Sequence, residues 1–563
     1  MRAEYPNLLF LLALEWVVHF WHCAQFGIYE DDWFFNAGPY VWGAGTWFDL
    51  MQRQMASFVF GRPVEILLLY TDGYVGAALD SFEVLYVIAY LYWALATVLL
   101  YFVLRNRYSP AFSLLAATLF VLSPLTSVRQ FLNTAYKMAP AYVLVFAGMW
   151  LYFRRRARWS YVLAGLSLFT YEWLFLLFFG APLLDRDSPL ISRRTLRHVV
   201  ICGLILAAAV GLRFALHESR LAGQTPGIVP LVRGIVEATF VHGVNIPLLI
   251  VNGAYLGVMN FNWVALFFGL CAAVAFLVLY RRAAASSIEL DWRAAARTIL
   301  TGACFTMLGL ALTYMASPDT QLGEFKVLGR ITRIFGPAEF GVAIALAGCW
   351  SAVEAAARGF RPVVRLLFGG FIVVLVLFQF MVQSDYTAAW AEQKQLAARV
   401  MRLTPDADRE TTILLRLHYH YHRFFDNENR MRAIGEEKSL LNRLFSFLHQ
   451  PGEPAPSIYF IYAEQWRNYL KPAEADKLRW KGSFVPDLFG FARRPLTPGD
   501  VIYIYHSKDG GYARINDLIF IGETTLTKTY VPSSESAWSR MQPSRLFHHM
   551  FPDGAPVQPV ESR

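Results

Sequence analysis

Charged residues are scarce in this chain. Only 17% of its 563 residues are Asp, Glu, Lys or Arg, whereas 56% are hydrophobic and 16% are aromatic. This balance excludes an ordinary soluble protein and indicates a chain that crosses a membrane many times. The formal net charge of +9 would suggest a nucleic-acid partner in a soluble protein. Because the arginines stand beside apolar runs, we attribute the charge to membrane topology and expect no nucleic acid.

Cysteine is also scarce, and its positions exclude a disulfide framework. The five cysteines all fall within apolar runs or at their edges, and no CxxC pair occurs that would indicate a cysteine metal site. The first apolar stretch has no A-x-A cleavage site and carries Glu15 and His19, so we expect a retained span and not a signal peptide. Glu15 and His19 lie four residues apart, which predicts that they pair on one helix face. Repeats with periods of 20–50 residues are also lacking.

The apolar runs predict eleven membrane spans within residues 1–382, with the arginine clusters on the cytoplasmic side. Segment 160–184 has basic flanks on both sides, so we expect a hairpin of two short helices turning near Tyr171 and Glu172. A single crossing is the alternative. Residues 27–82 and 217–258 are predicted outside loops. The predicted spans are 7–26, 83–104, 111–127, 138–153, the two helices of the hairpin, 199–216, 259–280, 297–316, 335–357 and 363–382.

Residues 383–563 are more polar and are about one domain long. A probable helix opens this part, and the runs "TTILLRLHY", "SIYFIYAE", "DVIYIYHS" and "DLIFIGETTL" have the composition of strands. The expected fold class is therefore mainly α: a polytopic membrane protein with a C-terminal extracytoplasmic α/β domain. His418, His420 and His422 alternate along the first run, where we expect an exposed strand face or an acceptor-contact surface and not a metal site.

Three consecutive acids follow the first predicted span, in "GIYEDDWFFNAGPY". They are Glu30, Asp31 and Asp32, and Trp33 comes next. One acid would be enough to cap a following helix, with Asp32 as the best-placed N-cap. Three acids beside aromatic residues at a membrane surface indicate in addition a cation site or a catalytic base.

Basic residues also occur in the predicted outside loops, where positive charge is usually sparse. A guanidinium group binds phosphate through two parallel hydrogen bonds, so these residues suit a phosphate that stays attached to a lipid. Snorkelling contacts to lipid headgroups are the alternative for each of them. Glu172 is an acid inside an apolar segment, which is costly and is explained by an arginine partner or by function. The basic residues in question are Arg62, Arg129, Lys137, Arg330 and Arg333.

The order of these motifs resembles that of the GT-C superfamily, the multi-span glycosyltransferases that use polyprenyl-phosphate sugars. The shared features are "DDW" after the first span, "GRP" later in that loop, "YE" in the apolar hairpin and "GRITRIFGP" before a late span. Within that superfamily the chain is most similar to bacterial GtrII-like enzymes that modify surface polysaccharides. The resemblance covers residues 1–400 in layout and implies a loop aspartate as base, here Asp31 or Asp32.

The chemistry of such a donor fits these residues. The lipid phosphate is a built-in leaving group, so one base for the acceptor hydroxyl and positive charge on the phosphate are sufficient. We expect no required cofactor, although the Asp31–Asp32 pair could hold Mg²⁺ or Mn²⁺. The expected partners are a polyprenyl-phosphate sugar, membrane lipids and a glycan, lipid or protein acceptor. The expected location is the bacterial inner membrane, with the C-terminal domain in the periplasm. A transporter or flippase for a lipid-linked glycan, and an O-antigen ligase or polymerase, are the alternatives.

Overall fold

A computed structural model describes most of the chain, which divides into two compact units. Unit 1 comprises Met1–Phe26, Phe48–Gly76 and Ser81–Tyr386, and unit 2 comprises Gly27–Trp47, Ala77–Asp80 and Thr387–Arg563. The described residues are 4–29, 32–57, 61–185, 192–218, 228–285, 292–313, 329–408, 411–417, 457–462, 470–472, 478–480, 501–506, 512–515, 517–520, 526–529, 538 and 542–554.

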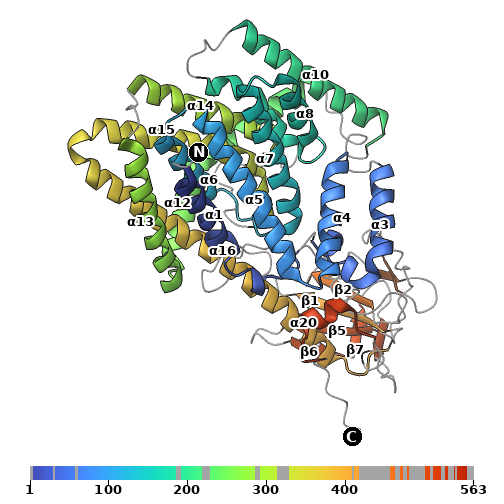
Figure 1. The fold of residues 1–563 in the computed structure, drawn as a ribbon. Coiled ribbons are helices and arrows are strands. Elements are labelled where there is room, and N and C mark those ends of the chain that lie inside the picture. The colour runs from blue at the N-terminus through green and yellow to red at the C-terminus, as the bar shows by residue number, and fades with distance from the viewer. Residues whose placement is uncertain are drawn as a thin grey trace. The chain divides into compact units, whose positions relative to one another are not determined.

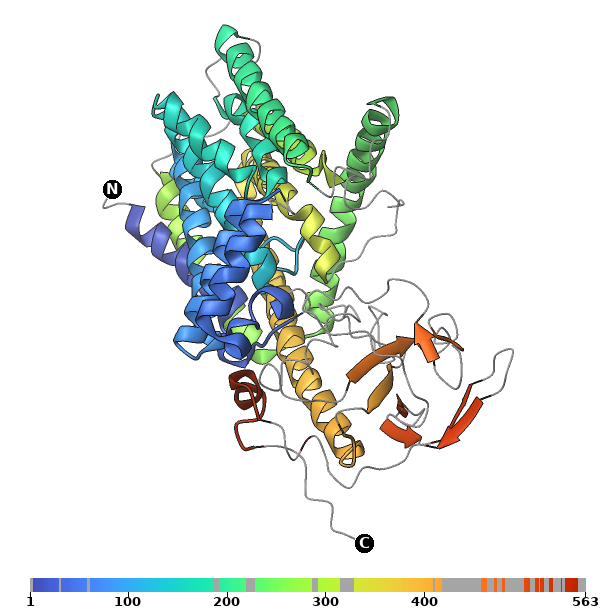
Figure 2. The same ribbon diagram turned by 90° about the vertical axis from the view of Figure 1, so that its right-hand side faces the viewer.

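Unit 1 is a bundle of helices (Figures 1 and 2). Its longer helices are α1 (Tyr5–Phe20), α4 (Pro63–Ala78), α5 (Phe82–Arg105), α6 (Pro110–Val121), α7 (Leu132–Phe153), α8 (Ala157–Ser167), α10 (Arg193–Ala215), α12 (Ile228–Met259), α13 (Trp263–Ala285), α14 (Trp292–Leu310), α15 (Glu339–Ala356) and the first part of α16 (Arg361–Leu403). Short 3₁₀ segments join them at Cys23–Gln25, Arg330–Ala338 (η6) and Arg358–Phe360. Helix α3 (Pro39–Ser57) begins in unit 2.

Glycines allow α14 and α15 to pack with their backbones in contact. A Cβ atom at Gly302 would lie 2.4 Å from the backbone nitrogen of Ala345, and one at Gly341 would lie 2.2 Å from that of Thr306. Helices in membranes commonly associate through small residues, because no hydrophobic effect drives their pairing there. This contact therefore has the character of a membrane bundle.

Seven helices among the described residues are long and apolar enough to cross a membrane, and several of the eleven predicted spans are not among them. Helix α6 has only 12 residues, and α7 and α14 do not qualify. The seven are Tyr5–Gln25, Phe82–Arg105, Arg193–Ala215, Val232–Met259, Trp263–Ala284, Thr332–Ala356 and Arg358–Leu403. These apolar helices indicate a multi-pass membrane protein.

The predicted outside loop 217–258 is wrong, because α12 occupies Ile228–Met259 as one helix of 32 residues. Pro247 and several glycines in this stretch suggested a loop. Proline and glycine are tolerated inside helices of a membrane bundle, because neighbouring groups satisfy the freed backbone. Two of the glycines are close-packing positions instead: Cβ atoms at Gly253 and Gly257 would press on Pro124 and Phe378.

Another predicted loop is helical, and the predicted domain boundary lies close to the division between the two units at Tyr386 and Thr387. Residues 27–82 are largely helical, with α2 (Asp32–Phe35), α3 and α4 following one another. The expected division at 382/383 lies inside α16, which runs without a break from Arg361 to Leu403. The apolar pattern stops near residue 382, but the helix continues because residues 385–403 also favour helix.

The predicted break in segment 160–184 is confirmed. Helix α8 ends at Ser167, and η3 (Glu172–Leu174), α9 (Phe175–Phe179) and η4 (Ala181–Leu184) follow as short pieces. The contacts of Arg107 show that residues just before and just after segment 160–184 lie close together. Its guanidinium lies 4.9 Å from the ring of Phe153, just before the segment, and 3.3 Å from the carboxylate of Asp185, just after it.

Unit 2 contains the described strands. Four of them form a sheet in the order β2-β1-β5-β6: β2 (Ser457–Tyr462), β1 (Thr412–Leu417), β5 (Val501–His506) and β6 (Tyr512–Ile515). Strand β1 pairs in parallel with β2 and β5, and β6 is antiparallel to β5. Two further antiparallel pairs join β3 (Leu470–Pro472) to β4 (Leu478–Trp480), and β7 (Asp517–Phe520) to β8 (Leu526–Thr529). The alternating histidines at 418–422 lie outside the described residues.

Candidate functional site

A cluster of charged side chains in unit 1 is centred on Arg62 and Glu172. The Nε and Nη2 atoms of Arg62 each donate a hydrogen bond of 2.6 Å to the two carboxylate oxygens of Glu172. Both side chains are largely buried, with exposed fractions of 9% and 18%. This parallel pair of charge-assisted bonds is the strongest geometry that an arginine and a carboxylate can form. The pair joins the "GRP" and "YE" motifs, which lie 110 residues apart.

Further ions surround this pair. The Nη1 atom of Arg62 donates to Glu65 at 3.1 Å, and the Nζ atom of Lys137 lies 3.6 Å from the other oxygen of Glu65. On the far side, the guanidinium of Arg213 lies 3.7 Å from Glu172. It also lies 3.7 Å from Glu218 and donates to the backbone carbonyl of Leu168. We call Arg62, Glu65, Lys137, Glu172, Arg213 and Glu218 the ion cluster.

The arginines of the cluster control the protonation state of Glu172. Burial raises the pKa of this carboxyl, but the charge and hydrogen bonds of Arg62 and the charge of Arg213 outweigh burial and lower it to about 2. Glu172 is therefore ionised at neutral pH. Burial raises the pKa of the neighbouring Tyr171 to about 12, against the opposing charges of Arg333 and Arg62, so its hydroxyl keeps its proton.

Tyr171 connects the cluster with the "GRITR" segment. The guanidinium of Arg62 lies 5.2 Å from the centre of the Tyr171 ring, and the charge of Arg333 also acts on this tyrosine. The backbone of this segment is fixed, because Gly329 donates its N–H to the hydroxyl of Ser127 at 2.9 Å. The Arg330 side chain lies outside the described part of the chain.

Gly61 allows the chain to approach the cluster. Its φ angle is +62°, in the left-handed region that favours glycine. A Cβ atom there would lie 2.5 Å from the carboxylate of Glu218. The backbone conformation therefore favours glycine before Arg62, and a side chain there would require the Glu218 carboxylate to move.

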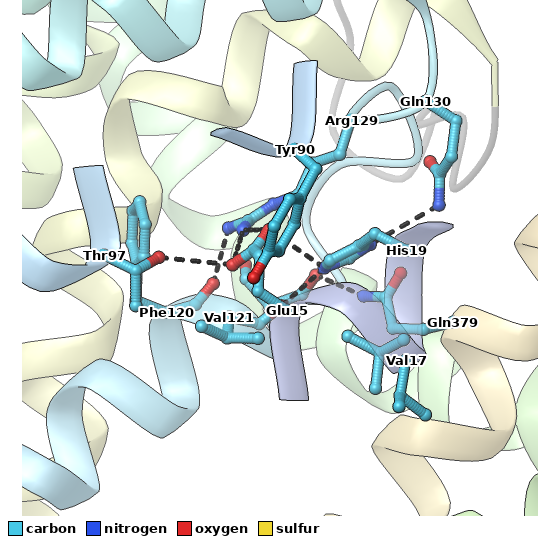
Figure 3. A network of polar contacts seen from close by, with 12 residues as sticks. Glu15, Val17, His19, Tyr90, Thr97, Phe120, Val121, Arg129, Gln130 and Gln379 are labelled. Carbon is cyan, nitrogen blue, oxygen red and sulfur yellow. Dashed lines mark hydrogen bonds and ion pairs between the residues drawn. The ribbon is translucent and has the colours of Figure 1, made fainter. Parts of the chain in front are cut away.

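Arg129, a predicted phosphate ligand, belongs to a different network (Figure 3). It is only 1% exposed, and its guanidinium donates to Glu15 at 3.0 Å and to Glu339 at 3.2 Å. It also donates to the carbonyl of Phe120 and stacks on the ring of Trp93 at 4.4 Å. These contacts hold α1, α5, α6 and α15 together inside the bundle, so we leave Arg129 out of the proposed donor site.

His19 lies in the same network. Its Nε2 atom is 3.9 Å from Glu15, as their spacing predicted, and 2.8 Å from the carbonyl oxygen of Val121. Gln130 approaches the Nδ1 atom at 3.4 Å. Glu15 and His19 are thus close together on one helix face, as predicted, but the hydrogen bonds to Glu15 come from Arg129.

The acidic turn lies in unit 2, and only part of it is described. Glu30 and Asp31 are outside the described residues. Asp32 is fully buried and begins α2, so it lies in the first turn of the helix and not before it. Burial, together with the charge of Asp32, raises the pKa of the neighbouring Tyr29, against the hydrogen bond from Gly27. Tyr29 is therefore protonated, and its hydroxyl accepts the N–H of Gly27 at 2.9 Å.

Helix α16 supports this turn within unit 2. The indole N–H of Trp33 donates to the Gln393 side chain at 3.1 Å, and Gln393 donates in turn to the carbonyl of Ile28. Trp390 lies against Gly27, where a Cβ atom would be only 1.9 Å from its ring. Trp33 is thus held in place by its contacts with Gln393 and Trp390.

Sequence reasoning missed three members of the ion cluster: Glu65, Arg213 and Glu218. The signal for Arg213 was present, because it is a lone arginine at the outer end of a predicted span, like the residues predicted to bind phosphate. Glu65 follows Arg62 by three residues, which is a helical pairing distance. Among the described residues no group of three or more His, Cys, Asp or Glu side chains is placed to hold a metal ion.

Comparisons with known proteins add no identification. The chain matches no family model, no curated protein and no solved structure. The apolar helices and the buried ion pairs define only a class: a multi-pass helical membrane protein.

Proposed function

We propose that this protein is an integral-membrane glycosyltransferase that moves a sugar from a polyprenyl-phosphate donor to an extracytoplasmic acceptor. One observation carries the proposal: charged residues from separate segments, which the sequence marks as candidates for the donor site, come together in the ion cluster. Arg62, Lys137 and Glu172 contact one another directly or through Glu65, and Arg333 acts on the adjoining Tyr171. Charged groups in a membrane bundle are costly, and they usually mark a functional site.

In this proposal the start of α7 lies at the membrane surface, and the cluster is then at the depth of a lipid phosphate. Lys137 follows the start of α7 at Leu132 by five residues, or about 8 Å along the helix. A phosphate whose polyprenyl tail remains in the bilayer would lie at about this level, near the headgroups. The cluster therefore supports a donor site close to the membrane surface.

The residues have different roles in this proposal. Glu172 occupies the paired N–H groups of Arg62, so Arg62 organises the cluster and offers its remaining N–H groups to the phosphate. Lys137, Arg330 and Arg333 supply further positive charge to the departing phosphate. Asp31 or Asp32 takes the proton from the acceptor hydroxyl, and Glu30 supports the turn. A divalent metal is not required.

A transporter of lipid-linked glycans is the second candidate. Two observations favour it: the helix break at Glu172, and the Glu15–Arg129–Glu339 ion pairs inside the bundle. Broken helices and buried charges are common at transporter binding sites. The acidic turn and the lack of internal repeats in the sequence favour the enzyme.

One experiment separates the two candidates. The purified protein is given a panel of labelled polyprenyl-phosphate hexoses and pentoses, first in detergent and then in sealed proteoliposomes. An enzyme cleaves the sugar–phosphate bond of one donor in detergent. A transporter moves the intact donor across the bilayer and leaves the bond unbroken, and that result would reject the glycosyltransferase.

The proposed location is the bacterial inner membrane, with residues from 387 onward in the periplasm as an α/β domain. The arginine clusters at 281–282 and 358–365 support this orientation, because positive charge concentrates on the cytoplasmic side. Because α12 is an apolar helix that was not predicted, the number of spans does not by itself determine on which side of the membrane the C-terminal residues lie. Polyprenyl-phosphate sugars and surface glycans are the expected partners.

A further inference from the structure

An exposed group of arginines lies where α7, α8 and α10 meet in unit 1. Four of them stand between the end of α7 and the first turn of α8, and three lie in the first two turns of α10. The sequence has no acid within 150–160 or 192–200. The two groups are neighbours in space, because the guanidinium of Arg194 lies 4.9 Å from the ring of Tyr152 near the end of α7. We call these exposed residues the arginine patch: Arg154, Arg155, Arg156, Arg158, Arg193, Arg194 and Arg197.

Arg155 occupies a backbone position that suits glycine. Its φ angle is +59°, in the left-handed region. Its N–H donates to the carbonyl of Tyr152 at 3.2 Å, and the N–H of Arg156 donates to that of Leu151 at 3.0 Å. This is the Schellman pattern of a helix end, in which the left-handed residue is usually glycine. The chain thus keeps an arginine at a strained position, and strained residues of this kind cluster at functional and ligand-binding sites.

An apolar surface continues from the patch along α8 and α10, which lie side by side (Figure 1). Near the start of both helices the hydroxyl of Tyr161 lies 3.0 Å from the Nδ1 atom of His198. Further along both, a Cβ atom at Gly165 would lie 3.6 Å from Ile205. The two helices therefore run in the same direction away from the patch. Their exposed apolar side chains are Val162, Leu166, Leu196, Val199, Val200 and Leu204.

This combination matches the two parts of an anionic phospholipid. Guanidinium groups bind a phosphate headgroup, and the apolar side chains along α8 and α10 suit its acyl chains. Trp159 is 63% exposed beside the arginines, and exposed tryptophan is typical of the headgroup level of a membrane. Membrane topology depends on the number of arginines and does not require one of them in a strained backbone position. Arg155 therefore indicates a contact beyond topology.

We propose that the arginine patch binds the headgroup of an anionic phospholipid, with the acyl chains of that lipid along α8 and α10. The proposed lipid site is distinct from the ion cluster. Arg213, the cluster member on α10, follows Arg197 by about 24 Å along the helix. The inference does not depend on the proposed glycosyl transfer, because a bound phospholipid here stabilises the helix bundle whatever reaction the protein performs.

The test measures thermal unfolding of the purified full chain in detergent micelles that contain increasing amounts of phosphatidylglycerol. Phosphatidylcholine with the same acyl chains tests the need for negative charge, and glycerol 3-phosphate tests the need for acyl chains. The rise in unfolding temperature with lipid concentration gives the apparent affinity, because a ligand that binds only the folded state stabilises it.

Two variants alter the patch: Arg155→Gly, and the double variant Arg193→Gln with Arg197→Gln. The matched control is the double variant Arg281→Gln with Arg282→Gln. These two arginines are also exposed, near the end of α13, and their replacement removes the same charge as the double variant of the patch.

We expect phosphatidylglycerol to raise the unfolding temperature of the wild type, and phosphatidylcholine and glycerol 3-phosphate to leave it unchanged. Arg155→Gly should unfold at the same temperature as the wild type or higher without lipid, because glycine relieves the strained backbone. Each arginine lost should lower the affinity for phosphatidylglycerol about fivefold, the equivalent of about 1 kcal/mol, so the double variant should lose about thirtyfold. The control should keep the affinity of the wild type.

Four results would overturn the inference. Equal stabilisation by phosphatidylcholine would show that the patch does not select a negative charge. Equal stabilisation by glycerol 3-phosphate would show a site for free phosphate groups and not for a lipid. An equal loss of affinity in the Arg281–Arg282 control would show an effect of net charge alone. Wild-type affinity in both patch variants would leave the arginines with a role in membrane topology only.

Discussion

Replacement of Glu172 by Gln should destabilise unit 1 because it leaves Arg62 buried without its main partner. The two residues form hydrogen bonds of 2.6 Å and are 9% and 18% exposed, so solvent screens the pair only weakly. Removing one partner of a buried ion pair costs about 3–5 kcal/mol. Arg62 keeps Glu65 at 3.1 Å, which favours the lower end of this range.

The protonation of Glu172 leads to a similar magnitude. Its pKa falls from 4.5 to about 2, which corresponds to about 3 kcal/mol at about 1.4 kcal/mol per pH unit. Because the pKa is lower in the folded state, this stabilisation is fully present above pH ~4.5 and is lost as the pH falls towards 2. The difference between wild type and Glu172→Gln should therefore be about 3 kcal/mol at pH 7 and should shrink below pH ~4.5.

The assay is reversible unfolding of the detergent-solubilised protein, followed by tryptophan fluorescence between pH 3.5 and pH 8. The control is Glu237→Gln, which breaks the ion pair between Arg233 and Glu237. That pair has a bond of 2.7 Å but is 77% and 60% exposed, so little change is expected. A Glu172→Gln variant as stable as the control at pH 7, or a difference that does not depend on pH, would refute the assignment of a strong buried pair.

Three further predictions concern the cluster and the orientation of the chain. Arg62→Lys keeps the charge but loses the paired hydrogen bonds to Glu172, so we expect weaker donor binding and slower turnover at normal expression. Wild-type kinetics would show that Arg62 only contacts lipid headgroups. Gly61→Ala should lower the unfolding temperature measurably, because φ is +62° and the added Cβ would contact Glu218. The control is Gly370→Ala, whose added Cβ would have no atom within 4 Å and which should not lower the unfolding temperature. A cysteine placed in 451–456 should react with an impermeant thiol reagent in cells with a permeabilised outer membrane; labelling that requires rupture of the inner membrane would contradict a periplasmic location.

Local sequence patterns were sufficient to predict the apolar helices and the break near Glu172. Basic residues on both flanks of 160–184 favour a hairpin over a single crossing, and Arg107 in the structure contacts both Phe153 and Asp185 at the ends of that segment. Helix α12 was not predictable in this way. Its Pro247 and its glycines are typical of loops in isolation, and only their packing against neighbouring helices shows that they lie in a helix.

The members of the candidate site were easier to predict than their partners. Arg62, Lys137 and Glu172 could be predicted because charge is unusual in such segments, but nothing local indicates that Glu172 pairs with Arg62 and Arg129 with Glu15. Those pairings depend on which helices are neighbours, and that follows from the packing of the whole bundle. The arginine patch shows the same limit, because its two groups are seen to be neighbours only once α7 and α10 are in place.

The most direct test of the account is donor turnover by Asp31→Asn and Asp32→Asn, measured with the labelled donor panel and with donor binding recorded separately. We predict that one variant keeps its fold and binds donor but turns over about 10²–10⁴-fold more slowly, as expected for loss of a general base. The other should have a partial defect, and Asp31 is the expected base because Asp32 lies in the first turn of α2. Turnover that disappears with a chelator, with both variants inactive, would instead indicate a required metal. Near wild-type turnover by both variants would contradict the catalytic role of the acidic turn and, with it, the proposed glycosyl transfer.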